Sequence, residues 1–222
     1  LYINPVNCFF YDAAQTEQAY QLQLHLPAAW QIASALHFDP NNTCEIANFD
    51  RLADSPFICS ASIERRSYEV DGRTFHICFN QQQMIPWERV LQDFQKFTAR
   101  QLQDFGEFPS QEYTFLIQSV PYAAYHGVEH LDSTVIALGP SCDIFGSLYT
   151  ELLGVCSHEL YHSWNIKALR PAEMQPYNFK NENYAQTGLI YEGITTYLGD
   201  LYLLKSGVFS TEQYLKELSK QV

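Results

Sequence analysis

The N-terminal third of the chain has the alternating polar and apolar positions of half-buried strands. Residues 20–26, YQLQLHL, alternate strictly, which is the period of a strand with one face on a core. Residues 62–80 form two such runs around Asp71 and Gly72. These two residue types tolerate the positive φ angles of a tight turn, so the segment predicts a β-hairpin. Residues 1 to about 82 are therefore predicted to be mostly β.

After residue 82 the apolar positions change to helical spacing. Residues 87–106 predict a helix that stops at Gly106, because glycine adopts the left-handed conformation that often ends helices. Two apolar runs of strand length follow, and then three more helices are expected. The expected strands cover residues 113–121 and 133–139, and the expected helices cover about 147–169 (before Pro171), about 184–205, and a segment that begins at Ser210 or Thr211.

The order of these elements predicts an α+β fold with two parts. Residues 1–82 are expected to form a β-rich N-terminal domain. Residues 83–222 are expected to form a second domain, with a small mixed sheet followed by helices.

Composition narrows the classes of function. The chain is 46% hydrophobic and 15% aromatic, which favours a packed core over disorder. Its formal net charge is -12, from 13 Lys+Arg against 25 Asp+Glu, and it has no block of basic residues. Nucleic acid and anionic membranes are therefore poor partners. No apolar run is long enough to span a membrane.

The ends and the cysteines of the chain add two expectations. The sequence begins without Met and ends inside a predicted helix, so we expect a fragment of a longer protein. The six cysteines include no C-x-x-C pair. An even count permits disulfides without requiring them in a chain of this size. Cys156 is expected to be a buried helix residue.

The stretch CSHELYHSW, residues 156–164, contains the motif H-E-x-x-H. On a helix, His158 and His162 lie one turn apart on the same face and can present two imidazole nitrogens to one ion. Glu159 lies beside them, where it can reach a metal-bound water. This arrangement is typical of metalloproteases, in which the metal activates the water and the glutamate takes its proton. Two histidines at this spacing also occur as ordinary surface or core residues, so the motif needs context.

Glu192 supplies that context as a third ligand. Catalytic zinc usually has three protein ligands and one position for water. Glu192 lies early in the apolar segment GLIYEGITTYLGDLYLL, where a carboxylate is costly unless it is paired or bound to metal. A glutamate on the helix surface is the alternative. Asp200 lies near the same face and is either a supporting residue or simply exposed.

These residues resemble the glycyl aminopeptidase family of metallopeptidases, whose members commonly carry a PDZ domain. The similar segments are HELYHSWNIKALRP and NENYAQTGLIYEGITTYLGDLYLLKSGVFSTEQYL, and LPAAW, FDRLADSPF and YHGVEHLDST also match family landmarks. The family is similar to the wider group of thermolysin-like peptidases, the gluzincins. The resemblance covers essentially the whole chain, and it implies a thermolysin-like fold for residues 83–222 and a bacterial origin. The compartment, cytoplasm or periplasm, stays open.

The resemblance also implies roles for individual residues. It implies that His158, His162 and Glu192 bind Zn²⁺ and that Glu159 is the general base. Related aminopeptidases place a Gly-x-x-Glu segment on an edge strand beside the zinc, where the strand pairs with the substrate and the glutamate binds its free α-amine. By resemblance, Gly127 and Glu129 bind the substrate.

Neighbouring residues receive weaker assignments. Glu129 as a solvated loop residue is the alternative to an amine-binding role. His130 is expected to bond Glu129 or the substrate, and Asn165 and Arg170 are expected either to brace the ligand-bearing helices or to serve packing and capping. Related enzymes often use a downstream tyrosine to stabilise the oxyanion, and we expect that residue to lie beyond the end of this chain.

Three functions are compatible with the sequence. The first is a zinc-dependent aminopeptidase that acts on peptides with a free N-terminus. The second is a zinc endopeptidase with the same site, which would still cleave an N-acetylated peptide. The third is a non-catalytic peptide-binding module with a relic zinc site, and the intact Glu159 argues against it. The sequence gives no indication of the oligomeric state.

Overall fold

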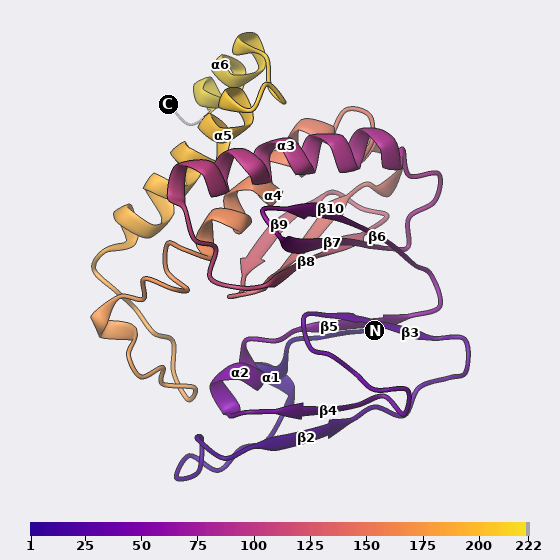
Figure 1. The fold of residues 1–222 in the computed structure, drawn as a ribbon, viewed down its shortest axis with the longest axis vertical. Helices are drawn as coiled ribbons and strands as arrows, with labels where there is room; N and C mark the ends of the chain where they lie inside the picture. The colour runs from indigo at the N-terminus through magenta and orange to yellow at the C-terminus, as the bar shows by residue number, and fades with distance from the viewer. Residues whose placement is uncertain (221–222) are drawn as a thin grey trace.

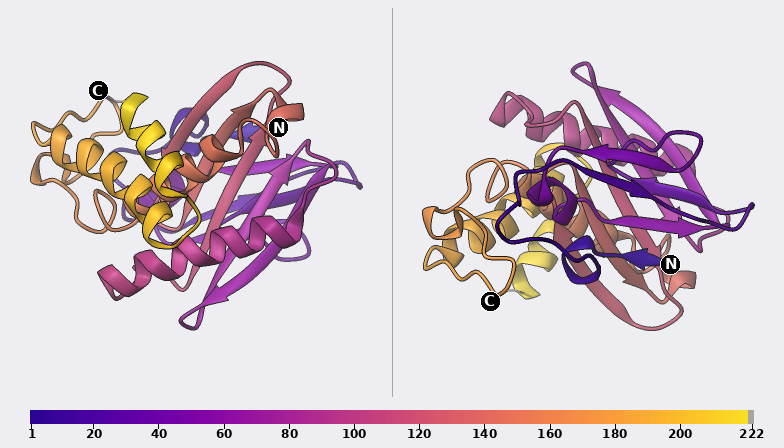
Figure 2. Two further views of the ribbon diagram at one scale, coloured as in Figure 1. Left: turned by 90° about the horizontal axis from the view of Figure 1, so that it is seen from above. Right: turned by 90° about the horizontal axis from the view of Figure 1, so that it is seen from below.

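The computed structural model describes residues 1–220 as three layers. Figure 1 shows a β-rich layer that contains the N-terminus, the central sheet above it, and helices on the far side of that sheet. Figure 2 shows the helical side from above, with α3, α5 and α6 in front of the strands. This architecture confirms the predicted α+β class.

The central sheet has the strand order β6-β7-β8-β10-β9. The β6–β7 and β10–β9 pairs are antiparallel, whereas β8 is parallel to both β7 and β10. Among the described residues, β9 pairs only with β10 and is therefore an edge strand. The strands are β6 (Ile63–Val70), β7 (Arg73–Asn80), β8 (Glu112–Ser119), β9 (Ala124–Glu129) and β10 (Ser133–Gly139).

The N-terminal layer consists of two small sheets and two short helices. One sheet has the order β1-β5-β3, and the other pairs β2 with β4. The elements are β1 (Tyr2–Ile3), α1 (Pro5–Cys8), β2 (Tyr20–Gln23), β3 (Gln31–Ser34), β4 (Thr43–Ile46), α2 (Phe49–Ala53) and β5 (Phe57–Ser60).

The helical layer covers one face of the central sheet and forms the main hydrophobic core with it. Aromatic residues such as Phe94, Phe97 and Phe115 pack edge to face in this core. The helices are α3 (Trp87–Phe105), α4 (Tyr149–His162), α5 (Ile194–Lys205) and α6 (Thr211–Lys220), with short turns η1 (Ser141–Asp143), η2 (Ala172–Met174) and the π-helical η3 (Leu189–Gly193). No helix among residues 1–220 is long and apolar enough to cross a membrane.

Several local predictions are confirmed. Asp71 and Gly72 both have positive φ in the turn between β6 and β7. Gly106 has φ 80° and follows the last residue of α3. Ser210 caps α6, because its hydroxyl accepts a hydrogen bond from the Gln213 amide at 3.2 Å while the Gln213 side chain accepts one from the Ser210 amide.

Two helix boundaries were wrong. The helix predicted over 147–169 ends at His162, well before Pro171. After the helix, backbone hydrogen bonds join residues five positions apart, such as the bond from the Lys167 amide to the His162 carbonyl at 3.1 Å. Ile166 in this segment has a positive φ of 99°. The helix predicted from 184 begins as the π-turn η3 at Leu189. The strand predicted over 20–26 stops at Gln23.

The division of the chain at residues 82 and 83 stays a prediction. The central sheet contains strands from both sides of this division, because β7 is hydrogen-bonded to β8. The pairing runs from Thr74, opposite Glu112, to Asn80, opposite Gln118. We propose that the β-rich unit instead ends near residue 62, between β5 and β6.

Candidate metal centre

Two histidines of α4 present their ring nitrogens to one point. His158 and His162 are four residues apart, and their Nε2 atoms lie 2.9 Å from each other. His162 is 1% exposed, whereas the His158 side chain is about one-fifth exposed. The helix therefore places one candidate ligand in the core and the other at the surface of the site.

Glu192 completes a set of three ligand atoms. Its Oε2 lies 3.7 Å from the Nε2 atom of each histidine. The three ligand atoms all lie within 4.8 Å of one another. The sequence separation of 30 residues between His162 and Glu192 is closed by the packing of α5 against α4.

The spacing and the chemistry of this set fit a zinc ion. Ligand atoms at zinc's usual bond lengths are about 3.3 Å apart in a tetrahedral site; here the two nitrogens are 2.9 Å apart, and each lies 3.7 Å from the Glu192 oxygen. The Nδ1 atom of His162 donates to the carbonyl oxygen of Asn165 at 3.0 Å. This bond selects the tautomer with an Nε2 lone pair, which a metal requires. Two imidazoles and one carboxylate form a known donor set of catalytic zinc.

Glu159 lies close to His162, and its surroundings favour the protonated form of its carboxyl group. It is 5% exposed, and its Oε2 atom is buried without a hydrogen-bond partner in the described part of the chain. Burial raises the pKa of Glu159 to about 8, and the charge of nearby Glu129 adds to the shift. In contrast, the pKa of Glu192 is held well below its usual range by the two imidazoles beside it. One carboxyl group thus favours its protonated form and the other its ionised form.

Asn165 connects the two ligand-bearing segments. Its backbone carbonyl accepts from His162, and its side-chain amide donates to the Ile190 carbonyl at 3.2 Å and to the Thr195 hydroxyl at 3.0 Å. These bonds satisfy polar groups in and just after η3, the π-turn that carries Glu192. The contacts fit the bracing role expected for Asn165.

A second set of contacts brings α4 and α5 unusually close. The Ser157 hydroxyl donates to the Gly199 carbonyl at 2.7 Å, and the Gln101 amide of α3 donates to Ser157 at 2.9 Å. A side chain at Gly199 would meet the backbone of His158 at 3.1 Å. The glycine therefore permits the close approach that brings Glu192 to the histidines.

The edge strand β9 runs alongside this centre and carries the two residues assigned to substrate binding. Gly127 and Glu129 are separated by one residue, a Gly-x-Glu spacing rather than Gly-x-x-Glu. Because strand residues two apart face the same side, both look toward α4. Carboxylate oxygens of Glu129 and Glu159 lie within 4.8 Å of each other and of a His162 ring nitrogen.

His130 makes a different contact from the one expected. Its Nδ1 atom pairs with Asp54 Oδ1 at 3.0 Å, and the ring is 5% exposed. Asp54 also accepts from the Leu131 amide at 3.0 Å and from Lys167 Nζ at 2.7 Å. The β-rich unit thus holds both the end of β9 and the segment after α4. Consecutive residues of a strand point to opposite faces, so His130 faces Asp54 whereas Glu129 faces α4.

Arg170 also contacts the β-rich unit rather than the ligand-bearing helices. Its guanidinium lies 3.5 Å from Asp50 and over the ring of Tyr177. Trp164 is buried and donates to the Glu107 carbonyl at 2.9 Å. Cys156 is fully buried in the core, as expected.

Asp200 lies on α5 and is half-buried. It lines a cavity of about 280 Å³ together with His158 and Tyr125. This position beside a metal-ligand candidate fits a supporting residue better than an exposed one.

Sequence reasoning missed several residues that organise the centre. Asp54 lies more than 70 residues from each of its side-chain partners, and no local pattern reveals such a contact. Ser157 looks like an ordinary helix residue. The only signal for Asp54 was that the segment FDRLADSPF resembled a family landmark.

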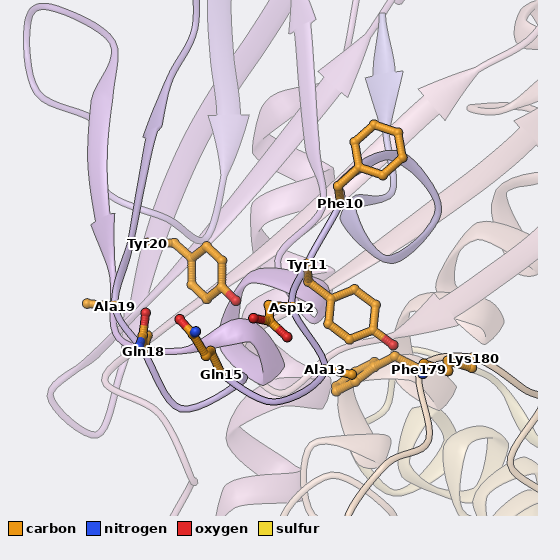
Figure 3. Close-up of a pocket in the computed structure, with 10 residues that line it drawn as sticks. All are labelled: Phe10, Tyr11, Asp12, Ala13, Gln15, Gln18, Ala19, Tyr20, Phe179 and Lys180. Carbon is orange, nitrogen blue, oxygen red and sulfur yellow. The ribbon is translucent and has the colours of Figure 1, made fainter.

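A surface cavity lies between the β-rich unit and the segment at Phe179 and Lys180, away from the candidate metal centre. It has a volume of about 710 Å³, and Figure 3 shows Tyr11, Tyr20 and Phe179 among the side chains that line it. Its charged side chains are Asp12 and Lys180. This cavity offers no set of metal ligands, so the candidate chemistry stays with α4 and η3.

Comparison with known protein families gives two matches at the two ends of the chain. Residues 1–61 match the peptidase M61 N-terminal domain, and residues 151–222 match the M61 glycyl aminopeptidase domain. The second match includes His158, Glu159, His162 and Glu192. A search of curated proteins gave no match.

Solved structures show the same fold. An aminopeptidase N family protein from Idiomarina loihiensis is similar to 97% of the chain, with 28% identity and a TM-score of 0.90. An M1 zinc metallopeptidase from Deinococcus radiodurans is similar to 85% of the chain with 17% identity and a TM-score of 0.50, and its mutant bound to a Tyr-Ser-Ala substrate gives a TM-score of 0.51. At 17% identity the likeness is one of fold alone. The chain spans 39% of the first relative's length and about 40% of the others'.

Proposed function

Because the chain belongs to the M61 glycyl aminopeptidase family, we propose that it carries the catalytic centre of a zinc-dependent aminopeptidase. The observation that carries this proposal is the convergence of His158, His162 and Glu192, whose ligand atoms lie within 4.8 Å of one another beside the buried Glu159. These three residues would hold zinc. When bound there, zinc would lower the pKa of a water molecule and polarise the scissile carbonyl.

Glu159 is the general base in this proposal. Its carboxylate would take a proton from the attacking water and later pass it to the leaving amine. Support comes from its environment: Glu159 is 5% exposed, and its Oε2 atom has no hydrogen-bond partner among the described residues. The carboxylate is therefore free to accept a proton from a water molecule.

Recognition of the free amine is assigned to Glu129. A substrate that added to the open edge of β9 would place its backbone along the strand. The carboxylate of Glu129 is close to that of Glu159 and to His162, so an ammonium group bound to Glu129 would lie one residue from the scissile bond. Two neighbouring carboxylates also favour a cationic group between them.

Two alternatives remain as outcomes of the test. An endopeptidase would use the same zinc ligands without an amine at Glu129. A non-catalytic binding module would hold zinc without hydrolysis. The desolvation of Glu159 favours an enzyme over a binding module, because burying a carboxyl group costs free energy that a simple binding surface does not require.

The experiment compares two peptides that differ only in N-acetylation. The zinc-loaded protein is incubated with each, and release of the N-terminal residue and internal cleavage are both measured. The proposal expects release from the free peptide and no cleavage of the acetylated one. Cleavage of both at equal rates would establish the endopeptidase, and cleavage of neither with zinc bound would leave the binding module.

A further inference from the structure

Gly127 has no backbone reason to be glycine. It lies in the regular part of β9, opposite Ile136 of β10. It is not one of the glycines with positive φ, which are Gly72, Gly106 and Gly207. Glycine weakens a strand and often marks a close approach of another group. The reason for this glycine must therefore lie in what faces it.

The group that faces it is the carboxylate of Glu159. A Cβ atom at position 127 would lie 2.1 Å from Glu159 Oε1 and 2.7 Å from Glu159 Cδ. It would also lie 2.9 Å from Cγ2 of Val155, one turn earlier on α4. Contacts under 3.0 Å are essentially never made by real Cβ atoms, so any other residue at 127 would take the volume that the Glu159 carboxylate occupies.

The packing of α4 opposes a movement of the helix that would relieve this clash. Cys156 and Leu160 flank Glu159 on α4, and both are fully buried. The backbone carbonyl of Glu159 accepts a hydrogen bond from the Tyr113 hydroxyl at 3.3 Å. The displacement would therefore fall on the Glu159 side chain, whose carboxylate would have to leave its place beside His162.

We propose that Gly127 is a positioning residue for the general base. The absence of a side chain at Gly127 forms the slot that fixes the Glu159 carboxylate next to the metal ligands. This inference rests on the proposed function, and it assigns Gly127 a role through Glu159 instead of the direct substrate contact that the resemblance implied. Edge strand β9 thereby contributes to the proton-transfer step as well as to the binding of substrate.

The kinetic test uses Gly127→Ala, with Gly146→Ala as the control, since a Cβ at Gly146 meets nothing nearer than 3.6 Å. Gly127→Ala is expected to retain zinc and to keep KM within about twofold, while kcat falls by about 100-fold, the cost of misplacing a catalytic group by about 1 Å. Gly146→Ala is expected to change neither constant. A raised KM with unchanged kcat would overturn the inference and favour a substrate contact.

A double variant tests whether the effect acts through Glu159. Glu159→Asp shortens the side chain by one methylene and withdraws the carboxylate from the slot. In that background, Gly127→Ala is expected to reduce kcat by less than about threefold further, because the two changes affect one interaction. An additional loss of about 100-fold, equal to that in the parent protein, would overturn the inference.

A crystal structure of Gly127→Ala gives a readout that does not depend on activity. The Glu159 carboxylate is expected to be displaced from β9, with His158, His162 and Glu192 unmoved. An unmoved carboxylate would overturn the inference whether or not the protein hydrolyses peptides. If Gly127→Ala fails to fold, the same structure is determined with Val155→Ala added, which removes the second close contact.

Discussion

His162 donates its Nδ1 hydrogen to the backbone carbonyl of Asn165 at 3.0 Å. The same asparagine donates its side-chain amide to the turn that carries Glu192. One residue thus orients a candidate ligand on α4 and supports the segment that carries another candidate ligand. The end of α4 at His162 makes this arrangement feasible, because a continued helix would carry Asn165 away from η3.

Asn165→Ala should reduce zinc affinity by about 10- to 100-fold, the usual cost of losing a residue that supports metal ligands. The carbonyl of residue 165 survives this change, so the loss comes from the freed turn around Glu192. Competition with a metal indicator measures the affinity. Exposed Asn7→Ala is the matched control and should leave the affinity unchanged, and an equal affinity in both variants would contradict the bracing role.

Glu192→Ala should lower zinc affinity by more than about 100-fold, since it removes a direct ligand rather than a supporting residue. Metal analysis after dialysis against a weak chelator measures the zinc content. Glu173 is an exposed glutamate on η2, and Glu173→Ala should retain one zinc per chain. Full zinc content in Glu192→Ala would show that this carboxylate is not a ligand.

Glu129→Gln should raise KM for peptides with a free N-terminus by roughly 30-fold. The change removes a charge-assisted hydrogen bond to the substrate ammonium, which is worth about 2 kcal/mol. Steady-state kinetics with the free peptide provide the measurement, with Glu64→Gln on the exposed side of β6 as the control. An unchanged KM would contradict an amine-binding role for Glu129.

Asp54→Asn should lower the free energy of unfolding by about 3 kcal/mol near neutral pH, because it leaves the buried Lys167 ammonium without its counter-charge. Urea unfolding measures the difference. Exposed Glu69→Gln should change the free energy by no more than about 0.5 kcal/mol.

The free energies of unfolding of the parent protein and of Asp54→Asn should depend differently on pH. His130 and Lys167 outweigh the effect of burial and hold the pKa of Asp54 well below its ordinary value. A carboxyl group with a depressed folded-state pKa contributes stability that is full above its unfolded pKa of about 4 and is lost as pH falls toward its folded pKa. The gap between the parent and Asp54→Asn should therefore narrow below about pH 4. A gap that widens on acidification would contradict the assignment.

Local chemistry in the sequence was enough to predict the β6–β7 hairpin, the end of α3 at Gly106 and the strand at Ser133–Gly139. Those features depend on turn residues and on periodicity that lie within a few positions of each other. The i, i+4 spacing of His158 and His162 likewise predicted that their side chains lie together on one face of a helix, as they do.

The remaining features depend on contacts between distant segments. The early end of α4 and the π-turn at Glu192 are stabilised by Asn165, whose bonds reach residues 25 or more positions away. Asp54 acts from another layer of the fold, and Gly127 is explained only by the carboxylate that faces it. Spacing along one chain cannot reveal these contacts, because each is created by the packing of layers.

The central claim is that Glu159 moves a proton for a zinc-assisted hydrolysis, and Glu159→Gln tests it most directly. The variant is isosteric, so it should bind one zinc per chain with the affinity of the parent protein. Its kcat for release of an N-terminal residue should fall by about 1,000-fold, within the range expected for loss of a general base. Zinc retained with hydrolysis lost is the predicted result, and a zinc-loaded Glu159→Gln protein that hydrolyses the peptide at the parental rate would contradict the mechanism.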